Sequence, residues 1–286
     1  MMKLCVSSGI SASLPDRIRL PFEESVRLAK QAGFEEFDLG LSSRLLLEED
    51  WEKRLEDMQE AIDRAGMHIR YVHTPYDYPC SQAPEEWERF ELASMRCIEK
   101  VPELGADCAA IHPRSFMKPD YDPDEEYAEA VRFLTPYCEK AHRHSVVLGI
   151  EIMRGAGASA PARIRRFGTD VDVLIRLADE MDEGICWDTG HAHISLQQQY
   201  KSIRKIGKRL KMVHINDNFA EDDVHLAPFL GKIDWMQTMK GLKEIGYSGS
   251  MNLEVKCNAL PLELRESYAA YMAASGRYLI RLFESL

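Results

Sequence analysis

The chain has 286 residues, of which 45% are hydrophobic and 29% are charged, and its formal net charge is −11. This length can bury a large core, and the acidic balance argues against a polyanion-binding protein, so nucleic acid is not the expected partner. Since no run approaches the roughly 18 apolar residues of a membrane-spanning helix, no membrane partner is expected either.

Eight short apolar segments are predicted to form buried strands. In chain order they are Leu4–Ser7, Glu36–Leu39, His68–His73, Cys108–His112, Val146–Glu151, Gly184–Asp188, Lys211–Ile215 and Ser250–Val255. Each is followed by a predicted helix: Pro21–Gln31, Glu48–Ala65, Pro84–Leu104, Asp124–His144, Val171–Asp182, Leu196–Lys208, Trp235–Ile245 and Leu260–Ser285. Strict alternation of strands and helices implies a parallel sheet, and eight pairs predict an α/β protein with a closed (β/α)₈ TIM barrel.

Glycines at the helix ends support these boundaries. Gly33, Gly66, Gly105 and Gly246 each follow a predicted helix and precede the next strand. Glycine tolerates the left-handed conformation that commonly ends a helix. Because no linker, low-complexity tract or change of composition divides the chain, residues 1–286 are predicted to form a single domain.

Six of the apolar runs stop at a side chain that can bind a metal ion. These residues are His73, His112, Glu151, Asp188, His214 and Glu254. The carboxyl ends of the strands of a parallel barrel meet on one face, and this face holds the active site in TIM-barrel enzymes. The sequence therefore predicts an enzyme with a metal site at the mouth of the barrel.

The oxygen and nitrogen donors of this group favour a divalent metal cofactor. Glu151, Asp188, His214 and Glu254 offer three carboxylates and one imidazole, a set that suits Mn²⁺, Zn²⁺, Co²⁺ or Mg²⁺. Buried carboxylates need a partner or a cation, which favours a bound ion. The alternative is that these carboxylates cap loops or pair with arginine.

Further candidates are predicted to bind the substrate or a second metal ion. They are His73, His112, His191, Asp223, His225 and Lys256. One ion accepts only about four to six ligands, so the whole set cannot serve a single metal. A lone histidine at a strand end is more often a hydrogen-bonded structural residue, and that reading stays open for each one alone.

Two long loops are predicted to reach the substrate from the same face. Residues 154–168 follow the strand that ends at Glu151, and residues 216–233 follow the strand that carries His214. The first loop is basic, with Arg163, Arg165 and Arg166. These arginines either hold a phosphate or carboxylate of the substrate or shield the acidic mouth.

Several motifs resemble one family of barrel enzymes. They are IHP at 111–113, GIE at 149–151, WDTGHAH at 187–193, VHINDN at 213–218, DVHLAPFLGKIDW at 223–235 and LEV at 253–255. Over nearly its whole length the chain resembles the xylose isomerase-like superfamily of sugar isomerases and epimerases, which also includes the type-four apurinic/apyrimidinic endonucleases. The WDTGH motif, followed by H-x-x-D and later by L-E, is a strong signature of the superfamily, but it does not identify a particular substrate.

The resemblance implies roles for particular residues. Glu151, Asp188, His214 and Glu254 would hold a divalent metal, and the two glutamates would also act as acid and base on a sugar, sugar phosphate or polyol. Proton transfer would pass through a metal-stabilised enediolate. His191 resembles a substrate-binding donor.

The chain departs from the ketose 3-epimerase pattern at two places. That group has a further glutamate shortly after the position of Glu151, where this chain has RGAGASA. It also has an arginine shortly after the position of His214, where this chain has NDNFAEDD. The resemblance therefore does not name the sugar.

Two other activities stay open. In the endonuclease branch, the counterparts of His73, His112, His191, Asp223 and His225 complete a three-zinc cluster, and this chain has a suitable residue at each position. A metal-dependent sugar dehydratase is the other alternative. The seven cysteines lack CxxC spacing and indicate reduced thiols in a cytoplasmic protein, and a homo-oligomer is compatible with the sequence.

Overall fold

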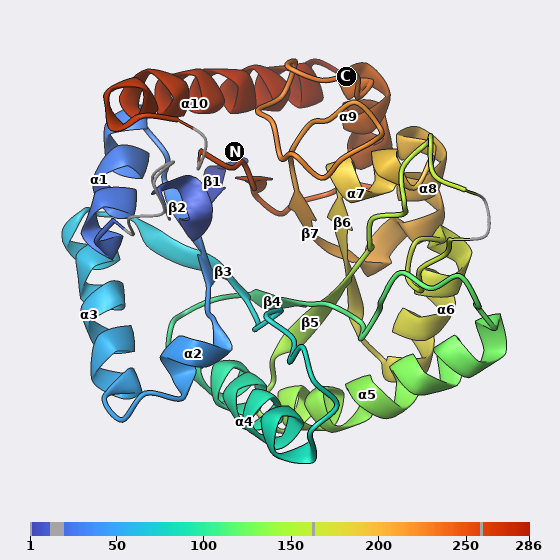
Figure 1. Cartoon of the computed structure of the whole chain (residues 1–286). Coiled ribbons are helices and arrows are strands. Elements are labelled where there is room, and N and C mark those ends of the chain that lie inside the picture. Colours follow the sequence, from blue (N-terminus) through green and yellow to red (C-terminus); the bar gives the residue numbers. More distant parts are fainter. Residues whose placement is uncertain (1, 12–19, 162–163, 258–259) are drawn as a thin grey trace.

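Eight parallel strands curl into a nearly closed barrel that helices surround, as Figure 1 shows for the computed structural model. The described residues are 2–11, 20–161, 164–257 and 260–286. The strands are β1 (Leu4–Ser7), β2 (Glu36–Gly40), β3 (His68–His73), β4 (Cys108–Ile111), β5 (Val147–Glu151), β6 (Gly184–Asp188), β7 (Leu210–His214) and β8 (Met251–Leu253). Consecutive strands from β1 to β7 pair with one another, and β1 pairs with β8, which confirms the predicted (β/α)₈ barrel.

Helices cover the outside of this barrel (Figure 1). They are α1 (Phe22–Ala32), α2 (Ser43–Leu46), α3 (Trp51–Arg64), α4 (Pro84–Lys100), α5 (Pro123–Arg143), α6 (Val171–Met181), α7 (Thr189–Ile194), α8 (Gln199–Ile206), α9 (Trp235–Glu244) and α10 (Leu262–Ser285). Two short 3₁₀ turns, η1 (Ser8–Ser11) and η2 (Gly207–Arg209), precede α1 and β7. Each of the longer helices buries one stripe of apolar side chains against the strands.

The structure contains two short helices, α2 and α7, that the sequence analysis did not predict. The prediction for residues 48–65 merged the end of a loop with α3 and omitted α2, which begins when Ser42 Oγ accepts a hydrogen bond from Leu45 N–H at 3.3 Å. The prediction for residues 196–208 omitted α7, which starts directly after β6. Asp188 caps α7 by accepting the His191 N–H at 2.6 Å. This cap stabilises the first turn of α7, so the helix begins directly after the strand.

The barrel closes between β7 and β8 through a single bridge. Ile215 pairs with Leu253, and its N–H donates to Asn252 O at 2.8 Å. The N–H of Glu254 then donates to Ile215 O at 3.1 Å. The backbone of Glu254 is therefore fixed by β7, although the residue lies just beyond the end of β8.

Alternation along the strands explains why the metal-capable residues share one end of the barrel. A lower layer of its interior consists of Cys5, Tyr71, Cys108, Ala110, Cys186 and Met212. Since strand side chains alternate between the two faces, the residue two positions after an inward-facing one also points inward. Met212 is thus followed by His214, and Cys186 by Asp188. The same step in the other strands leads to His73, His112, Glu151 and Glu254.

Gly149 lets this interior close. A Cβ at Gly149 would lie 3.3 Å from the Cβ and the backbone nitrogen of Cys186 and 3.4 Å from Cγ of Met212. The absent side chain allows β5, β6 and β7 to approach closely directly beneath Glu151. The floor of the site is therefore packed rather than hollow.

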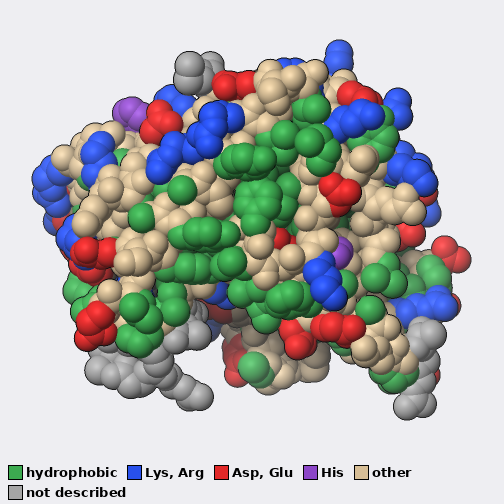
Figure 2. Space-filling model, turned by 90° about the horizontal axis from the view of Figure 1, so that it is seen from above, with side chains coloured by type: hydrophobic (Ala, Val, Ile, Leu, Met, Phe, Trp, Pro, Cys, Tyr) green, Lys and Arg blue, Asp and Glu red, His purple; other side chains and the backbone are tan. Residues whose placement is uncertain are grey.

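Apolar side chains gather on the face formed by α10, α9 and the loop before α9 (Figure 2). The exposed ones there are Phe229, Leu230, Met236, Tyr271 and Tyr278. Contiguous exposed apolar surface is typical of contact regions between proteins. The homo-oligomer stays a prediction, and this face is where we expect a second copy of the chain to bind.

Among the described residues, no helix is both long and apolar enough to cross a membrane.

A buried carboxyl group at the opposite end of the barrel predicts a pH-dependent stability. Glu183 accepts the Leu148 N–H at 2.7 Å, and its other oxygen lies 3.2 Å from His142 Nε2. Burial raises the pKa of Glu183 to about 7, despite the opposing effect of the Leu148 N–H. Because this folded-state pKa lies above the ordinary value of 4.5, stability is highest when the group is protonated and is lost as the pH rises through about 7.

We expect Glu183→Gln to remove this pH dependence. The stability advantage of the variant over the wild type should grow by about 1 to 2 kcal/mol between pH 5 and pH 8, as measured by urea unfolding. Glu139→Gln, an exposed glutamate on α5, is the control and should show no such trend. A constant difference between Glu183→Gln and the wild type at both pH values would contradict the prediction.

Candidate active site

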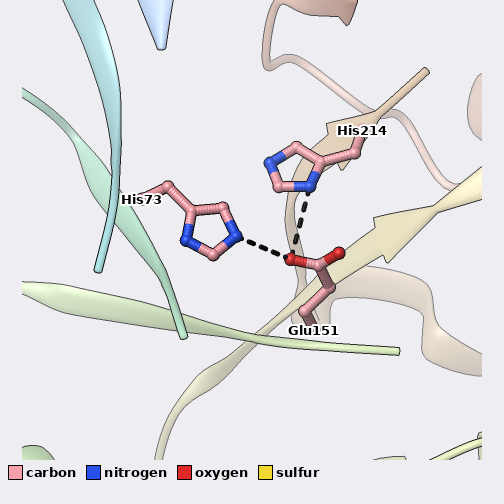
Figure 3. A group of neighbouring side chains, drawn as sticks. All are labelled: His73, Glu151 and His214. Atoms are coloured by element: carbon pink, nitrogen blue, oxygen red, sulfur yellow. Dashed lines mark hydrogen bonds and ion pairs between the residues drawn. The ribbon is translucent and has the colours of Figure 1, made fainter. Parts of the chain in front are cut away.

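Glu151, at the end of β5, is the centre of the candidate site. Its Oε2 lies 3.2 Å from His73 Nε2 and 3.3 Å from His214 Nδ1, so two histidines from opposite walls face the same oxygen (Figure 3). His112 Nε2 lies 3.2 Å from the same atom, and His191 Nδ1 lies 3.1 Å from Oε1. The Glu151 side chain is about 1% exposed. A fully buried carboxylate is thus ringed by imidazoles.

Four of the predicted ligands come together around His214. One donor atom from each of Glu151, Asp188, His214 and Glu254 lies within 4.8 Å of the others. His214 Nδ1 is 3.3 Å from Glu151 Oε2 and 3.4 Å from Glu254 Oε2, so it lies between the two glutamates. This is the set expected from the sequence, drawn from β5, β6, β7 and the residue after β8.

A second group lies beside the first. His191, Asp223 and His225 also place their donor atoms within 4.8 Å of one another. Asp223 Oδ1 is 3.0 Å from His225 Nε2 and 3.6 Å from His191 Nε2. His191 connects the two groups, because its other ring nitrogen faces Glu151. We call Glu151, Asp188, His214 and Glu254 the deep group, and His191, Asp223 and His225 the outer group.

The histidine hydrogen bonds test whether this arrangement suits a cation. Nδ1 of His73 lies 2.8 Å from Thr74 O, and Nδ1 of His225 lies 2.8 Å from Glu254 O. A ring that donates Nδ1–H to a carbonyl presents the lone pair of Nε2, and here each Nε2 faces a carboxylate. The lone pair of Nε2 and a carboxylate oxygen are both electron-rich and repel each other, unless a proton or a metal ion lies between them.

Buried polar atoms without hydrogen-bond partners also indicate a bound cation. Among the described residues, Glu254 Oε2, His214 Nδ1 and Asp223 Oδ1 are buried and have no hydrogen-bond partner of acceptable geometry. Buried polar atoms are rarely left unsatisfied, so such a cluster needs an explanation. The donor atoms of both groups fit a divalent cation, with oxygen and nitrogen ligands from several strands.

The electrostatics reflect the mixture of acids and imidazoles. Burial raises the pKa of Glu151, but the facing His214 and His112 outweigh it and hold that pKa well below its usual range. Burial raises the pKa of Asp188 to about 6, against the opposing effect of His191. For Asp223, His191 and His225 together overcome burial and lower the pKa. The carboxylates of the site are thus largely ionised near neutral pH and available as ligands or bases.

Both long loops reach the cavity above these residues, as expected. It has a volume of about 270 Å³, and Glu151, Glu254 and the outer group line it together with Tyr76, Tyr78, Met153 and Lys256. Lys256 Nζ lies 3.8 Å from Asp223 Oδ2, at the rim. The first loop contributes Arg154 and Arg166, and the second contributes Asp223 and His225. Arg165 is exposed and does not line the cavity, while Arg163 lies outside the described residues.

The loop between β7 and α9 is organised by one buried carboxylate. Asp217 accepts the N–H groups of Asn218, Phe229 and Ile233 at 2.9 to 3.1 Å, and the indole N–H of Trp235 at 3.1 Å. This loop holds His225 at a φ of 45°, a conformation that costs a non-glycine residue free energy. Asp217 and its partners hold the loop that places Asp223 and His225 at the site.

Sequence reasoning missed two contributors. Asp38 on β2 lies 3.2 Å from His214 Nε2 and accepts Asn252 Nδ2–H at 2.7 Å, so a further buried carboxylate faces the imidazole. Its signal was an acidic residue inside a buried strand. The second is Arg154, the first residue of the basic loop 154–168. The sequence analysis considered only the later arginines of this loop.

The chain is similar in sequence to a family of known proteins. Residues 26–274 match the family model described as xylose isomerase-like TIM barrel. The chain is 27% identical over 218 residues to an uncharacterised protein of Methanocaldococcus jannaschii, which covers 71% of this chain and 70% of that protein. It is 25% identical over 215 residues to the D-psicose 3-epimerase of Enterocloster bolteae, which covers 71% and 66%.

Solved structures show the same fold. A xylose isomerase domain protein from Alicyclobacillus acidocaldarius superimposes with a TM-score of 0.77 at 18% identity, covering 99% of this chain and 100% of that one. A D-tagatose 3-epimerase-like protein gives 0.72 at 21% identity, covering 99% and 97%. A D-psicose 3-epimerase from Clostridium cellulolyticum H10, solved with D-tagatose, gives 0.75 at 14% identity, covering 98% and 99%.

Proposed function

Because the chain belongs to the xylose isomerase-like TIM barrel family, we propose that it is a divalent-metal-dependent sugar isomerase or epimerase. The observation that carries the proposal is the pair of glutamates, Glu151 and Glu254, on either side of His214 Nδ1. The similarity to a D-psicose 3-epimerase supports a sugar, sugar phosphate or polyol as substrate.

The deep group would hold the metal ion. Glu151, Asp188, His214 and Glu254 would supply its donor atoms, and Asp38 lies against the far side of the His214 ring, 3.2 Å from Nε2. When bound, a divalent ion polarises a carbonyl and so acidifies the neighbouring C–H bond of the substrate. Mn²⁺, Zn²⁺, Co²⁺ and Mg²⁺ all accept this set of ligands.

The two glutamates would carry the proton. Their carboxylates approach the cavity from β5 and from the end of β8, so a substrate carbon between them has one carboxylate on each side. One would remove the carbon-bound proton to give an enediolate, and the other would deliver a proton to the opposite face. Opposed groups explain inversion at one carbon better than a single base does.

The outer group would bind substrate hydroxyls. His191 is anchored through its main-chain N–H to Asp188, and its ring lies between Glu151 and Asp223. Lys256 and Tyr76 close the rim of the same cavity. These donors and acceptors would orient an open-chain polyol so that its reacting carbon meets the glutamates.

The outer group also keeps a second activity open. His191, Asp223 and His225 are sufficient for a further metal ion, and several ions together would suit a zinc-dependent endonuclease that cuts abasic DNA. The number of ions per chain separates the two proposals.

Elemental mass spectrometry of the untagged protein measures that number. We expect about one ion of Mn, Co, Mg or Zn per chain, since the deep group offers the ligands for one. Two to three zinc ions per chain would instead favour the endonuclease, and cleavage of abasic duplex DNA that falls steeply with salt would establish it.

Deuterium exchange tests the chemistry itself. A panel of ketoses, sugar phosphates and polyols incubated with the metal-loaded protein in D₂O should yield one epimer or isomer that carries deuterium at the inverted or newly protonated carbon. A product lighter by one water would identify the dehydratase instead. No exchange on any member of the panel would overturn the proposal.

A further inference from the structure

Arg154 and Arg166 line one wall of the active-site cavity, and both come from the loop between β5 and α6. Arg166 donates from Nε to Ser115 Oγ at 3.2 Å, and Ser115 is itself buried and bonded to Phe167 O at 2.7 Å. Within the part of the chain that the structure describes, the two terminal nitrogens of Arg166 have no hydrogen-bond or ion-pair partner. The guanidinium is therefore positioned at Nε and free at its other two nitrogens.

No acidic residue of the site forms an ion pair with Arg166 among the described residues. Lys256 and Arg154 approach Asp223 Oδ2 at 3.8 and 3.9 Å, and these contacts can offset its charge. Arg166 has no carboxylate within 4.0 Å among the described residues. Burial, together with the nearby Arg154, lowers the pKa of Arg166. Two like charges on one wall cost free energy unless an anion joins them.

We infer that Arg154 and Arg166 bind an anionic group of the substrate, a phosphate or a carboxylate, so that the site takes an acidic sugar rather than a neutral one. Guanidinium groups match the oxygens of both anions with paired N–H donors, which a single ammonium group does not. This inference rests on the proposed function and specifies its substrate class.

The position of the arginines places the anion away from the reacting carbon. Arg154 Nε lies 3.9 Å from Asp223 Oδ2, and Asp223 Oδ1 lies 3.6 Å from His191 Nε2, whose ring in turn contacts Glu151. Two side chains thus separate the arginine from the carboxylate at the centre. The anionic group belongs at the far end of the sugar, and not on the carbon that exchanges its proton.

Binding of inorganic phosphate tests the anion site without any turnover. Calorimetric titration of the protein as purified should show phosphate binding, and Arg166→Gln or Arg154→Gln should each weaken it by about 10- to 100-fold, the loss expected for a charge-assisted hydrogen bond. Arg165→Gln is the matched control, because Arg165 is exposed in the same loop and does not line the cavity. Absent phosphate binding, or equal weakening by all three changes, would overturn the inference.

Substrate preference then separates the two anions. The metal-loaded enzyme is assayed with a neutral ketose, with its terminal phosphate ester and with its terminal carboxylate. One charged form should have a kcat/KM at least about 100-fold above that of the neutral sugar, and Arg166→Gln should reduce this ratio. A preference for the neutral sugar would overturn the inference. Phosphate binding that depends on Arg166, with no turnover of any sugar, would overturn the proposed function and leave the anion site standing.

Discussion

Glu254→Gln is expected to lower kcat by about 10²- to 10⁴-fold while the protein stays folded, because the amide cannot accept or deliver the proton that the carboxylate transfers. Burial raises the pKa of Glu254, but His214 and His225 outweigh it and lower that pKa, so the carboxylate is ionised at neutral pH. Its Oε2 is buried and has no hydrogen-bond partner among the described residues. Steady-state turnover measures the change, and circular dichroism confirms the fold.

Metal content has to be measured on the same sample. Glu254 is also a proposed ligand, so elemental analysis of Glu254→Gln distinguishes lost acid–base chemistry from a lost ion. Glu151→Gln should give a loss of similar size if the two glutamates serve opposite faces of one carbon. Asp222→Asn, an exposed change in the loop before α9, is the control and should leave turnover unaltered. Normal turnover by Glu254→Gln would refute its catalytic role.

Asp217→Ala is expected to cost about 3 to 5 kcal/mol of unfolding free energy, since it leaves several N–H donors without their carboxylate. Asp217 is fully buried, and its donors come from the following residue, from the later part of the same loop and from α9. The loop carries Asp223 and His225, so the folded fraction should also lose activity. Urea unfolding followed by tryptophan fluorescence measures the first effect.

A second substitution tests the same loop. A Cβ at Gly231 would clash with Asp217 Oδ1 and with the backbone of Asn218, so Gly231→Ala should displace both and also destabilise the loop. Asp222→Ala removes an exposed carboxylate from this loop and should change stability by less than about 0.5 kcal/mol. An unchanged unfolding midpoint for Asp217→Ala would show that the loop is held by other contacts.

The sequence by itself determined the barrel and the layer of metal-capable residues. Both follow from local patterns: short continuous apolar runs, helix-ending glycines such as Gly33 and Gly66, and a change from apolar to ligand-type side chains at the strand ends. His73, Glu151 and His214 lie at one end of the barrel because parallel strands place equivalent positions at one height. No long-range information is needed for that step.

Only the tertiary structure decided which of these residues meet. The distances from Glu151 to its four histidines depend on strand register, and register shifts occur between β2 and β3 and between β6 and β7. The same cross-barrel packing brings Asp38 to His214 and separates the outer group of Asp223 from the deep one. The free guanidinium of Arg166 is likewise visible only once Ser115, 51 positions away in the chain, is beside it. These contacts join distant segments, and no local pattern encodes them.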